Sequence, residues 1–307
     1  MRPVAVSLGD PAGIGPEITL RALRAFTPRG GVLLYGDPAS VPRRWSAARA
    51  GQAWRALPSR GWKHGRPSAC SGEAAFQAVS GAARAALSGE ARALVTAPLS
   101  KEALHLAGHH WPGHTELLAH MAGLKPDEVG MLLVGGGLRV FLVTRHVSLR
   151  SALGALKPAA LDKALDLCAR GLKSSLGLRR PRLALAALNP HAGEAGAFGR
   201  EELDVLGPWA RRRARGAGYS LAGPLPADTV FVQAVRGAYD AVLCLYHDQG
   251  LIPLKLLAFD SGVNVTLGLP FLRTSPDHGT AWDLAGTGRA SCASMVEAFR
   301  LADRHGA

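Results

Sequence analysis

The stretch Tyr239-Asp-Ala-Val-Leu-Cys-Leu-Tyr-His-Asp-Gln-Gly-Leu-Ile-Pro-Leu-Lys255 decides the fold class. An apolar strand, predicted over residues 241–246, stops at the polar group His247-Asp248-Gln249-Gly250, where Gly250 is expected to turn the chain. A second apolar segment then carries Lys255. In open α/β proteins, ligands bind at the carboxyl ends of the strands. The stretch therefore predicts an α/β protein whose polar site residues follow its strands.

The rest of the chain alternates in the same way between short apolar runs and longer amphipathic ones. Since strands that alternate with helices form a largely parallel sheet with helices on both faces, this architecture is predicted here. Residues 42–72 are rich in Arg, Trp, Pro and Gly and give no clear prediction. Strands are predicted over residues 4–8, 30–35, 93–96, 182–188 and 263–267, a hairpin over 130–134 and 138–144, and helices up to residue 25, over 73–87 and 158–176, from about 201, and over 291–302.

Length and composition indicate a globular protein with more than one core. A chain of 307 residues exceeds the usual size of one hydrophobic core, so two domains are expected. No unbroken apolar run reaches the roughly 18 residues that a transmembrane helix needs. The four cysteines lie far apart without a Cys-x-x-Cys pair, which argues against a disulfide scaffold and against a cysteine metal site. A reducing cytoplasm fits this pattern best.

The formal net charge of +13 comes mostly from arginine. Such a charge can mark a nucleic-acid-binding protein. However, the basic residues are scattered apart from clusters such as Arg211–Arg215, which ends a predicted helix and has no aromatic residues interleaved with it. Binding of an anionic substrate or cofactor is the simpler explanation of the positive charge. The alternative is that the arginine-rich composition has no function.

Three histidines, His146, His191 and His247, each stand just beyond a predicted strand. If these strands are parallel neighbours, the three imidazoles converge on one edge of the sheet, where they can hold a divalent transition metal and leave positions open for a substrate. The alternative is that each histidine only caps or hydrogen-bonds its own turn. Asp228 and Asp248 are the nearest carboxylates, and either could orient a ligating histidine, move a proton or stabilise a turn.

Several residues are candidates for binding an anion. Gly113-His114-Thr115 precedes a predicted helix and offers backbone N–H groups and a hydroxyl. Asn264 and Arg273 flank an apolar segment, and a guanidinium can grip a phosphate or carboxylate with two prongs. Lys255 could meet an anionic group or simply extend from its apolar segment. The loop Gly9–Gly15 is glycine-rich but matches neither the Gly-x-Gly-x-x-Gly fingerprint nor a P-loop.

Taken together, the motifs resemble the 4-hydroxythreonine-4-phosphate dehydrogenase family, called PdxA, of pyridoxal-phosphate biosynthesis. They occur in the family's order and span nearly the whole chain, which makes the combination specific although each motif alone is modest. The matching stretches are Gly9-Asp-Pro-Ala-Gly-Ile-Gly-Pro-Glu17, Gly113-His-Thr-Glu116, Asn189-Pro-His-Ala-Gly-Glu194, Leu225-Pro-Ala-Asp-Thr229, Tyr246-His-Asp-Gln-Gly250 and Arg273-Thr-Ser-Pro-Asp-His-Gly-Thr-Ala281.

The resemblance implies the fold of the isocitrate and isopropylmalate dehydrogenases, with two α/β/α domains and the active site in their cleft. Residues 1–125 with 265–307 would form the outer, cofactor-side domain, and residues 126–264 the central domain. The family's functional residues fall on the following positions: metal ligands His146, His191 and His247; substrate contacts His114, Thr115, Lys255, Asn264 and Arg273; and an NAD-binding loop with His278, Gly279, Thr280, Ala281 and Gly286.

The implied reaction is NAD- or NADP-dependent oxidation of the secondary hydroxyl of 4-phosphohydroxy-L-threonine, followed by decarboxylation to 3-amino-2-oxopropyl phosphate. One divalent metal ion (zinc, magnesium or cobalt) would lower the pKa of the hydroxyl. Asp228, Asp248 or Lys255 could relay the proton, and the sequence does not choose among them. The implied assembly is a homodimer with a shared active site and no membrane or nucleic-acid partner.

Two other functions stay open at this point. One is a paralogous dehydrogenase acting on another phosphorylated hydroxy acid, such as phosphothreonate or phosphoerythronate, because such an enzyme would keep the same motifs. The other is a metal hydrolase or lyase that uses the three histidines to activate water without a redox step.

Overall fold

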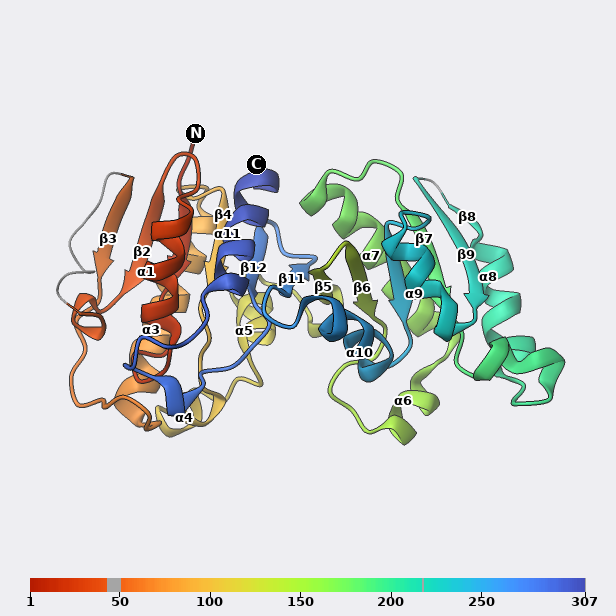
Figure 1. Ribbon diagram of the computed structural model, residues 1–307, viewed down its shortest axis with the longest axis horizontal. Helices are drawn as coiled ribbons and strands as arrows, with labels where there is room; N and C mark the ends of the chain where they lie inside the picture. Colours follow the sequence, from red (N-terminus) through yellow and green to blue (C-terminus); the bar gives the residue numbers. More distant parts are fainter. Residues whose placement is uncertain (43–50, 217, 307) are drawn as a thin grey trace. The chain divides into compact units, whose positions relative to one another are not determined.

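The computed structural model describes residues 1–42, 51–216 and 218–306, and the chain divides into two compact units. Unit 1 comprises Met1–Val129 and Val263–Ala307, and unit 2 comprises Gly130–Gly262. The sequence placed these boundaries after residues 125 and 264. Each unit has a sheet with helices on both faces (Figure 1), which is the α/β architecture that the alternating pattern predicts.

Unit 1 has a mostly parallel sheet in the order β3-β2-β1-β4-β12-β11, in which only β11 runs antiparallel, to β12. Helices α1 and α11 pack together on one face, and α3 covers the other (Figure 1). Its elements are β1 (Val4–Ser7), α1 (Gly15–Ala25), β2 (Val32–Gly36), η1 (Pro38–Ser40), β3 (Gln52–Ala56), α3 (Ala69–Leu87), β4 (Ala93–Thr96), α4 (Lys101–Leu106), α5 (His114–Met121), η2 (Pro126–Glu128), β11 (Val263–Leu267), β12 (Leu272–Pro276), η5 (Trp282–Leu284) and α11 (Ala293–His305).

The local sequence explains the long helix of unit 1. The Ser68 side chain accepts a hydrogen bond from the Ser71 backbone N–H, and the Ser71 side chain accepts one from the Ser68 backbone N–H. This capping box begins α3. The helix then presents small apolar residues such as Ala78 and Ala82 to the core, where each is fully buried. Strand β3 was not predicted from the sequence, because its side chains are mostly exposed and show no apolar run.

Unit 2 has its sheet in the order β5-β6-β10-β7-β9-β8. Strands β6, β10, β7 and β9 are parallel, while β5 and β8 run antiparallel to β6 and β9. Helices α9 and α10 lie on one face, and α7 and α8 on the other (Figure 1). The elements are β5 (Gly130–Gly135), β6 (Leu138–Leu142), α6 (Leu149–Ala155), α7 (Pro158–Leu176), β7 (Arg182–Ala186), η3 (Pro190–Gly196), η4 (Glu202–Leu206), α8 (Gly207–Arg213), β8 (Arg215–Gly216), β9 (Tyr219–Leu225), α9 (Ala227–Val235), β10 (Ala241–Cys244) and α10 (His247–Ala258).

The structure of unit 2 corrects one expectation and refines another. Gly250 does not turn the chain but lies buried inside α10, which begins at His247 and also carries Lys255. A Cβ at Gly250 would stand 2.9 Å from the Sγ of Cys244, so the glycine lets α10 pack closely on β10. The helix expected from residue 201 is present: Glu201 is helical, Glu202–Leu206 form one turn of π-helix, and α8 continues the helix to Arg213.

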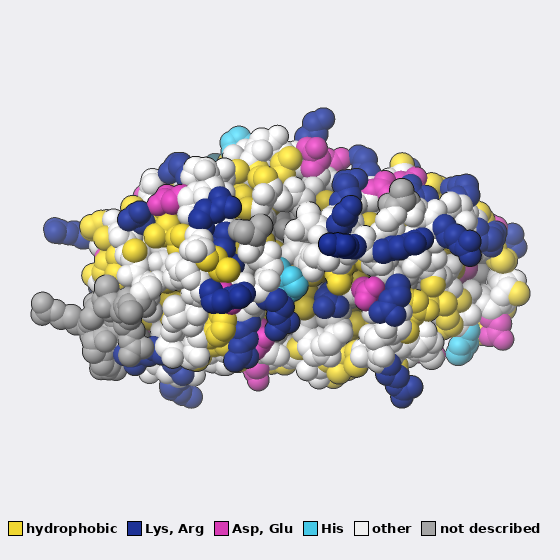
Figure 2. Space-filling view, turned by 90° about the horizontal axis from the view of Figure 1, so that it is seen from above, with side chains coloured by type: hydrophobic (Ala, Val, Ile, Leu, Met, Phe, Trp, Pro, Cys, Tyr) yellow, Lys and Arg dark blue, Asp and Glu magenta, His cyan; other side chains and the backbone are white. Residues whose placement is uncertain are grey.

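The surface is basic without a single concentrated patch on the face in view. Figure 2 shows Lys and Arg spread among hydrophobic and uncharged side chains on that face. In the basic cluster that ends α8, Arg213 forms ion pairs with Asp162 and Asp166, so part of this charge has a structural role within unit 2. Among the described residues, no helix is both long enough and apolar enough to span a membrane.

Candidate functional site

In unit 2, the three strands that precede the predicted histidine ligands are parallel neighbours. Strand β10 lies between β6 and β7 and is parallel to both. His146 follows β6, His247 follows β10 and His191 follows β7, so all three histidines belong to the carboxyl edge of one sheet. The metal hypothesis required these three strands to be parallel neighbours, and the strand order meets this condition.

Gln249 joins the ends of two of these strands and was not singled out from the sequence. Its side chain is buried; Oε1 accepts from the Leu245 backbone at 2.7 Å, and Nε2 donates to the Ala187 carbonyl at 2.7 Å. Since Leu245 follows β10 and Ala187 follows β7, this side chain fixes the two chain ends that lead to His247 and His191. The position of Gln249 within the His-Asp-Gln-Gly motif is the sequence signal that could have identified it.

His146 and His247 have the geometry that two ligands of one metal ion require. Their ring centroids are 5.6 Å apart, and two imidazoles bound to one tetrahedral ion by bonds of about 2.1 Å place their centroids about 5 Å apart. Asp248 Oδ1 lies 2.7 Å from His247 Nδ1. This contact leaves Nε2 of His247 available for a metal, which is the usual arrangement of a carboxylate behind a ligating histidine.

His191 lies in a strained turn and is exposed. Residues His191 to Ala195 all have left-handed backbone conformations, with φ values of 50, 55, 81, 40 and 53°. This conformation costs roughly 1–2 kcal/mol for each L-residue other than glycine, so the surrounding structure must hold the turn. Within residues 1–42, 51–216 and 218–306, no three His, Cys, Asp or Glu side chains lie close enough together to hold a metal ion. The complete triad therefore stays a prediction.

The other candidate proton carriers of unit 2 occupy different positions. Asp228 is exposed in the first turn of α9, directly after β9, the fourth parallel strand of this edge. Helix α9 contacts the turn that carries His191. Lys255 lies on α10 more than two turns after His247, about 12 Å along the helix axis at about 1.5 Å per residue. Its Nζ stands 5.6 Å from the ring centroid of Phe259.

In unit 1, Arg273 is a buried cation held by neutral groups. Its side chain on β12 is only 2% exposed. Nε and Nη2 donate to Thr96 Oγ1 on β4, at 3.2 and 2.6 Å, and Nη1 donates to Thr266 Oγ1 on β11 at 3.0 Å. No carboxylate in the described part of the chain forms an ion pair with it. Burial lowers the pKa of Arg273 to about 10, although the charge of the nearby Glu116 carboxylate acts in the opposite direction.

His114, Thr115 and Asn264 belong to the same unit as Arg273. Burial, and secondly the charge of Arg273, holds the pKa of His114 well below its usual value, so the imidazole is neutral at pH 7. His114 Nε2 and Asn264 Oδ1 are both shielded from solvent without a hydrogen-bond partner. Thr115 is buried in the first turn of α5. Unsatisfied buried polar atoms are rare, and here they indicate a polar ligand.

The predicted cofactor loop packs against the first glycine-rich loop of unit 1. The Thr280 carbonyl accepts from the Ile14 backbone at 3.0 Å, and a Cβ at Gly13 would stand 3.0 Å from the Cβ of Thr280. Ala281 has a φ of 41°, Gly279 is open on its Cα side, and His278 is exposed.

A cavity of about 340 Å³ adjoins this loop, and its lining includes Gly286, Gly13 and Glu17. The Glu17 carboxylate is 5% exposed, and its Oε1 has no hydrogen-bond partner. The cavity therefore offers a buried acceptor for a hydroxyl or amino group of a ligand.

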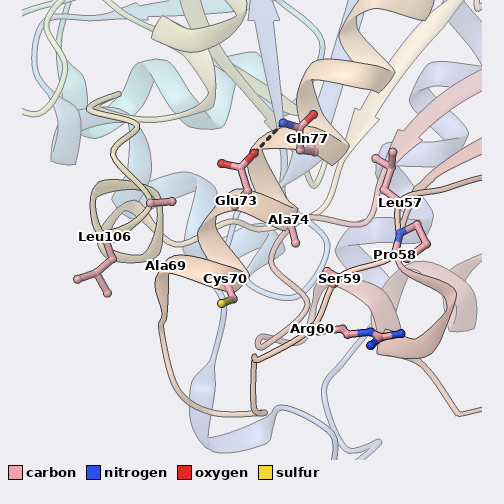
Figure 3. A pocket seen from close by; sticks show the side chains of 11 residues that line it. Leu57, Pro58, Ser59, Arg60, Ala69, Cys70, Glu73, Ala74, Gln77 and Leu106 are labelled. Atoms are coloured by element: carbon pink, nitrogen blue, oxygen red, sulfur yellow. Dashed lines mark hydrogen bonds between the residues drawn. The ribbon is translucent and has the colours of Figure 1, made fainter.

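A second, open cavity of unit 1, of about 670 Å³, lies along one face of α3 (Figure 3). Cys70, Glu73 and Gln77 of α3 line it together with the segment after β3 and the end of α4. Glu73 accepts from Gln77 Nε2 at 2.7 Å. No residue predicted from the sequence lines this cavity, so it is separate from the candidate site.

Asp10 is a buried carboxyl that the sequence did not single out. It is fully buried in the loop after β1, and its Oδ1 accepts from the Ala12 backbone at 2.9 Å. Burial raises the pKa of Asp10 to about 6, although the hydrogen bond from Ala12 acts in the opposite direction.

Comparisons with known proteins agree with the motifs. Residues 38–302 match the family described as "Pyridoxal phosphate biosynthetic protein PdxA". A 4-hydroxythreonine-4-phosphate dehydrogenase of Geobacter metallireducens is 46% identical over 97% of this chain and 94% of the relative. A D-threonate 4-phosphate dehydrogenase of Salmonella typhimurium is 43% identical over 97% of each chain.

Solved structures show the same similarity in three dimensions. The crystal structure of a 4-hydroxythreonine-4-phosphate dehydrogenase from Klebsiella pneumoniae superposes with a TM-score of 0.86, at 42% identity and 98% coverage of both chains. An isocitrate dehydrogenase from Methylococcus capsulatus matches with a TM-score of 0.51 at 12% identity, covering 99% of this chain and 85% of that one. The second likeness concerns the fold alone and confirms the predicted isocitrate-dehydrogenase-like architecture.

Proposed function

The chain belongs to the family of the pyridoxal phosphate biosynthetic protein PdxA, and from this membership we propose that it is a 4-hydroxythreonine-4-phosphate dehydrogenase. The proposed reaction is the NAD(P)-dependent oxidation of 4-phosphohydroxy-L-threonine at its secondary hydroxyl. Loss of carbon dioxide from the resulting β-keto acid then gives 3-amino-2-oxopropyl phosphate. The relatives are named as dehydrogenases, which leaves no support for a metal hydrolase or lyase.

The anion site of unit 1 carries this proposal. Burying a guanidinium that has no ion-paired carboxylate is unfavourable in free energy unless an anion binds to it. We assign Arg273 to the substrate phosphate or carboxylate, because its two prongs match these groups. His114 is neutral, so its ring can donate a hydrogen bond to the anion without adding charge, while Thr115 and Asn264 offer a hydroxyl and an amide.

In unit 2 we assign His146, His191 and His247 to one divalent metal ion, for which zinc, magnesium and cobalt are the options. When bound, such an ion supplies Lewis acidity that favours loss of the hydroxyl proton. Asp248 fixes the ring of His247 through Nδ1, which supports a role in orienting this histidine rather than in moving the proton. The pairing of His146 with His247 supports the donor set.

Asp228 and Lys255 are the remaining groups proposed to move the proton. Asp228 stands at the carboxyl edge of the same sheet as the histidines. Lys255 follows His247 by more than two turns of α10, and we propose that it acts at a site completed by a partner. We also keep Lys255 as a proposed substrate contact.

The nicotinamide cofactor is proposed to bind along the segment from His278 through Gly279, Thr280 and Ala281 to Gly286. A cavity of 340 Å³ is of the size that holds part of a dinucleotide. The buried acceptor Glu17 Oε1 in its lining suits a ribose hydroxyl. Either NAD or NADP is compatible with this lining.

A homodimer is proposed from an apolar face of α10. Ile252, Leu256 and Phe259 follow one another at helical spacing and are 60, 83 and 75% exposed. Such a face usually marks a protein interface. Because Lys255 lies on the same helix, an interface here would place Lys255 near a shared active site. Leu256→Glu should convert the dimer to a monomer in sedimentation velocity; an unchanged dimer would contradict this assignment. The cytoplasm is the proposed location, in keeping with four free thiols.

The test of the function is a comparison of substrates. Purified protein, loaded with a divalent metal, should reduce NAD or NADP with 4-phosphohydroxy-L-threonine and release carbon dioxide in equal amount. The competing candidate is D-threonate 4-phosphate, which is favoured by the relative of Salmonella typhimurium at 43% identity. A higher kcat/KM with D-threonate 4-phosphate would replace the proposed substrate, and no reduction with either would refute the dehydrogenase function.

A further inference from the structure

The turn that carries His191 is held by one buried carboxylate, that of Glu202. The side chain is 5% exposed and belongs to the π-helical turn before α8. Its Oε1 accepts from the backbone N–H groups of Leu188 and Asn189, at 2.7 and 2.9 Å. Its Oε2 accepts from Asn189 Nδ2 at 2.8 Å. Three donors from Leu188 and Asn189, which follow β7, thus converge on one carboxylate.

The glycines of the turn show how closely the carboxylate is packed. A Cβ at Gly193 would stand 2.9 Å from Glu202 Oε2, and a Cβ at Gly199 would stand 2.5 Å from Asn189 Nδ2. Asn189 Nδ2 also donates to Glu201 Oε2 at 2.7 Å, on the exposed side. The backbone at Gly193 and Gly199 therefore lies so close to Glu202 and Asn189 that a side chain at either glycine would displace this hydrogen-bonded pair.

We propose that Glu202 is a positioning residue for the metal site: its carboxylate holds Leu188 and Asn189, and through them it sets where the imidazole of His191 stands. The left-handed turn from His191 to Ala195 begins two residues after Asn189, so its direction depends on how Leu188 and Asn189 are held. This inference rests on the proposed function, because it takes His191 as a ligand.

The chemistry requires a carboxylate rather than an amide at this position. Both oxygens accept hydrogen bonds from N–H donors, and an ionised acceptor makes such bonds shorter and stronger. In Glu202→Gln, one oxygen becomes an NH₂ group that faces N–H donors. The near-isosteric substitution thus removes one of the two acceptors, and the negative charge, while keeping the volume.

The experiment measures Co²⁺ binding to the purified full chain by isothermal titration calorimetry, together with the visible spectrum of the Co²⁺ protein. Glu202→Gln should weaken Co²⁺ binding about 10- to 100-fold, as loss of a partner behind a metal ligand usually does, and should change the spectrum. The matched control is Asp204→Asn, which removes an exposed carboxylate of the same turn that pairs with Arg200. The control should stay within about twofold of the original protein.

Urea unfolding of each metal-free variant shows whether the protein is folded under the conditions of the titration. If Glu202→Gln does not fold, Asn189→Ala removes only the side-chain bond to the carboxylates and should weaken Co²⁺ binding by a smaller factor. A folded variant with unchanged affinity and spectrum would overturn the inference.

His191→Ala separates this inference from the proposed function. If His191→Ala weakens Co²⁺ binding and the Glu202 and Asn189 variants do not, the positioning role alone fails. If neither His191→Ala nor His247→Ala changes the affinity, the proposed metal site fails and the role of Glu202 falls with it.

Discussion

Replacing Arg273 by methionine should weaken substrate binding strongly while changing the stability of the ligand-free protein little. The fall of the Arg273 pKa to about 10 corresponds to about 3 kcal/mol of unfavourable free energy for burying the charge, and this penalty is present at any pH well below 10. Methionine removes that penalty. It also leaves the hydroxyls of Thr96 and Thr266 without their donor, at a cost of roughly 1–3 kcal/mol each. The two effects largely offset each other.

Arg92 provides the matched control, since it is also a buried arginine of unit 1 but is fully paired. It is 5% exposed, forms an ion pair with Asp303 at 2.7 Å, and donates to several backbone carbonyls, including that of Ala302. Arg92→Met removes the buried ion pair with Asp303, which keeps its bonds from Arg29, together with every hydrogen bond that the guanidinium donates to backbone carbonyls. It should therefore lower the free energy of unfolding by about 3–5 kcal/mol.

Urea unfolding followed by circular dichroism, with and without inorganic phosphate, measures both effects. Phosphate at about 100 times its Kd should stabilise the original protein by about 2.7 kcal/mol, and Arg273→Met should abolish this gain. The KM for the phosphorylated substrate should rise more than about 100-fold, because two charge-assisted hydrogen bonds are lost at about 1.5–3 kcal/mol each. The reasoning is refuted if Arg273→Met destabilises the ligand-free protein as much as Arg92→Met, or if phosphate still stabilises it.

Three further predictions concern other titratable residues. His247→Ala should abolish metal-dependent turnover. The urea midpoint should change little, because the side chain is partly exposed. If the variant keeps the activity of the unsubstituted protein in the chelator-controlled assay, His247 is not part of the site. Asp248→Asn should lower Co²⁺ affinity by about tenfold or less in calorimetry, since the carboxylate is largely exposed, and an unchanged affinity would deny it an orienting role. The raised pKa of Asp10 means that the folded protein binds the proton more tightly than the unfolded chain, so stability from this group should fall by about 3 kcal/mol as the pH rises from about 3 to 7. Asp10→Asn should flatten this part of the pH profile of urea unfolding, and an unaltered profile would show that Asp10 is not its source.

Local patterns determined much of the architecture from the sequence alone. Alternation of apolar runs with amphipathic stretches is a property of short segments, so it predicted the strands around residues 4–8 and 93–96 and the helix Pro158–Leu176 closely. The edge strand Gln52–Ala56 lacked this signal because its side chains face solvent. Gly250 was misinterpreted for a related reason: a glycine can mark a turn or a close contact, and only the packing of α10 on Cys244 distinguishes them.

The candidate site was predictable as a set of residue types and not as an arrangement. That histidines follow three strands can be seen in the sequence, but their place on one edge of adjacent strands depends on β10 inserting between β6 and β7, an order that does not follow the chain. The role of Glu202 depends on a turn that returns to the end of β7, and the electrostatics of Arg273 depend on hydroxyls from two other strands. Residue identity and spacing therefore determined which chemistry this chain can carry. Burial and long-range pairing, which exist only in the folded chain, decided which groups are charged, which are neutral, and which hold the others in place.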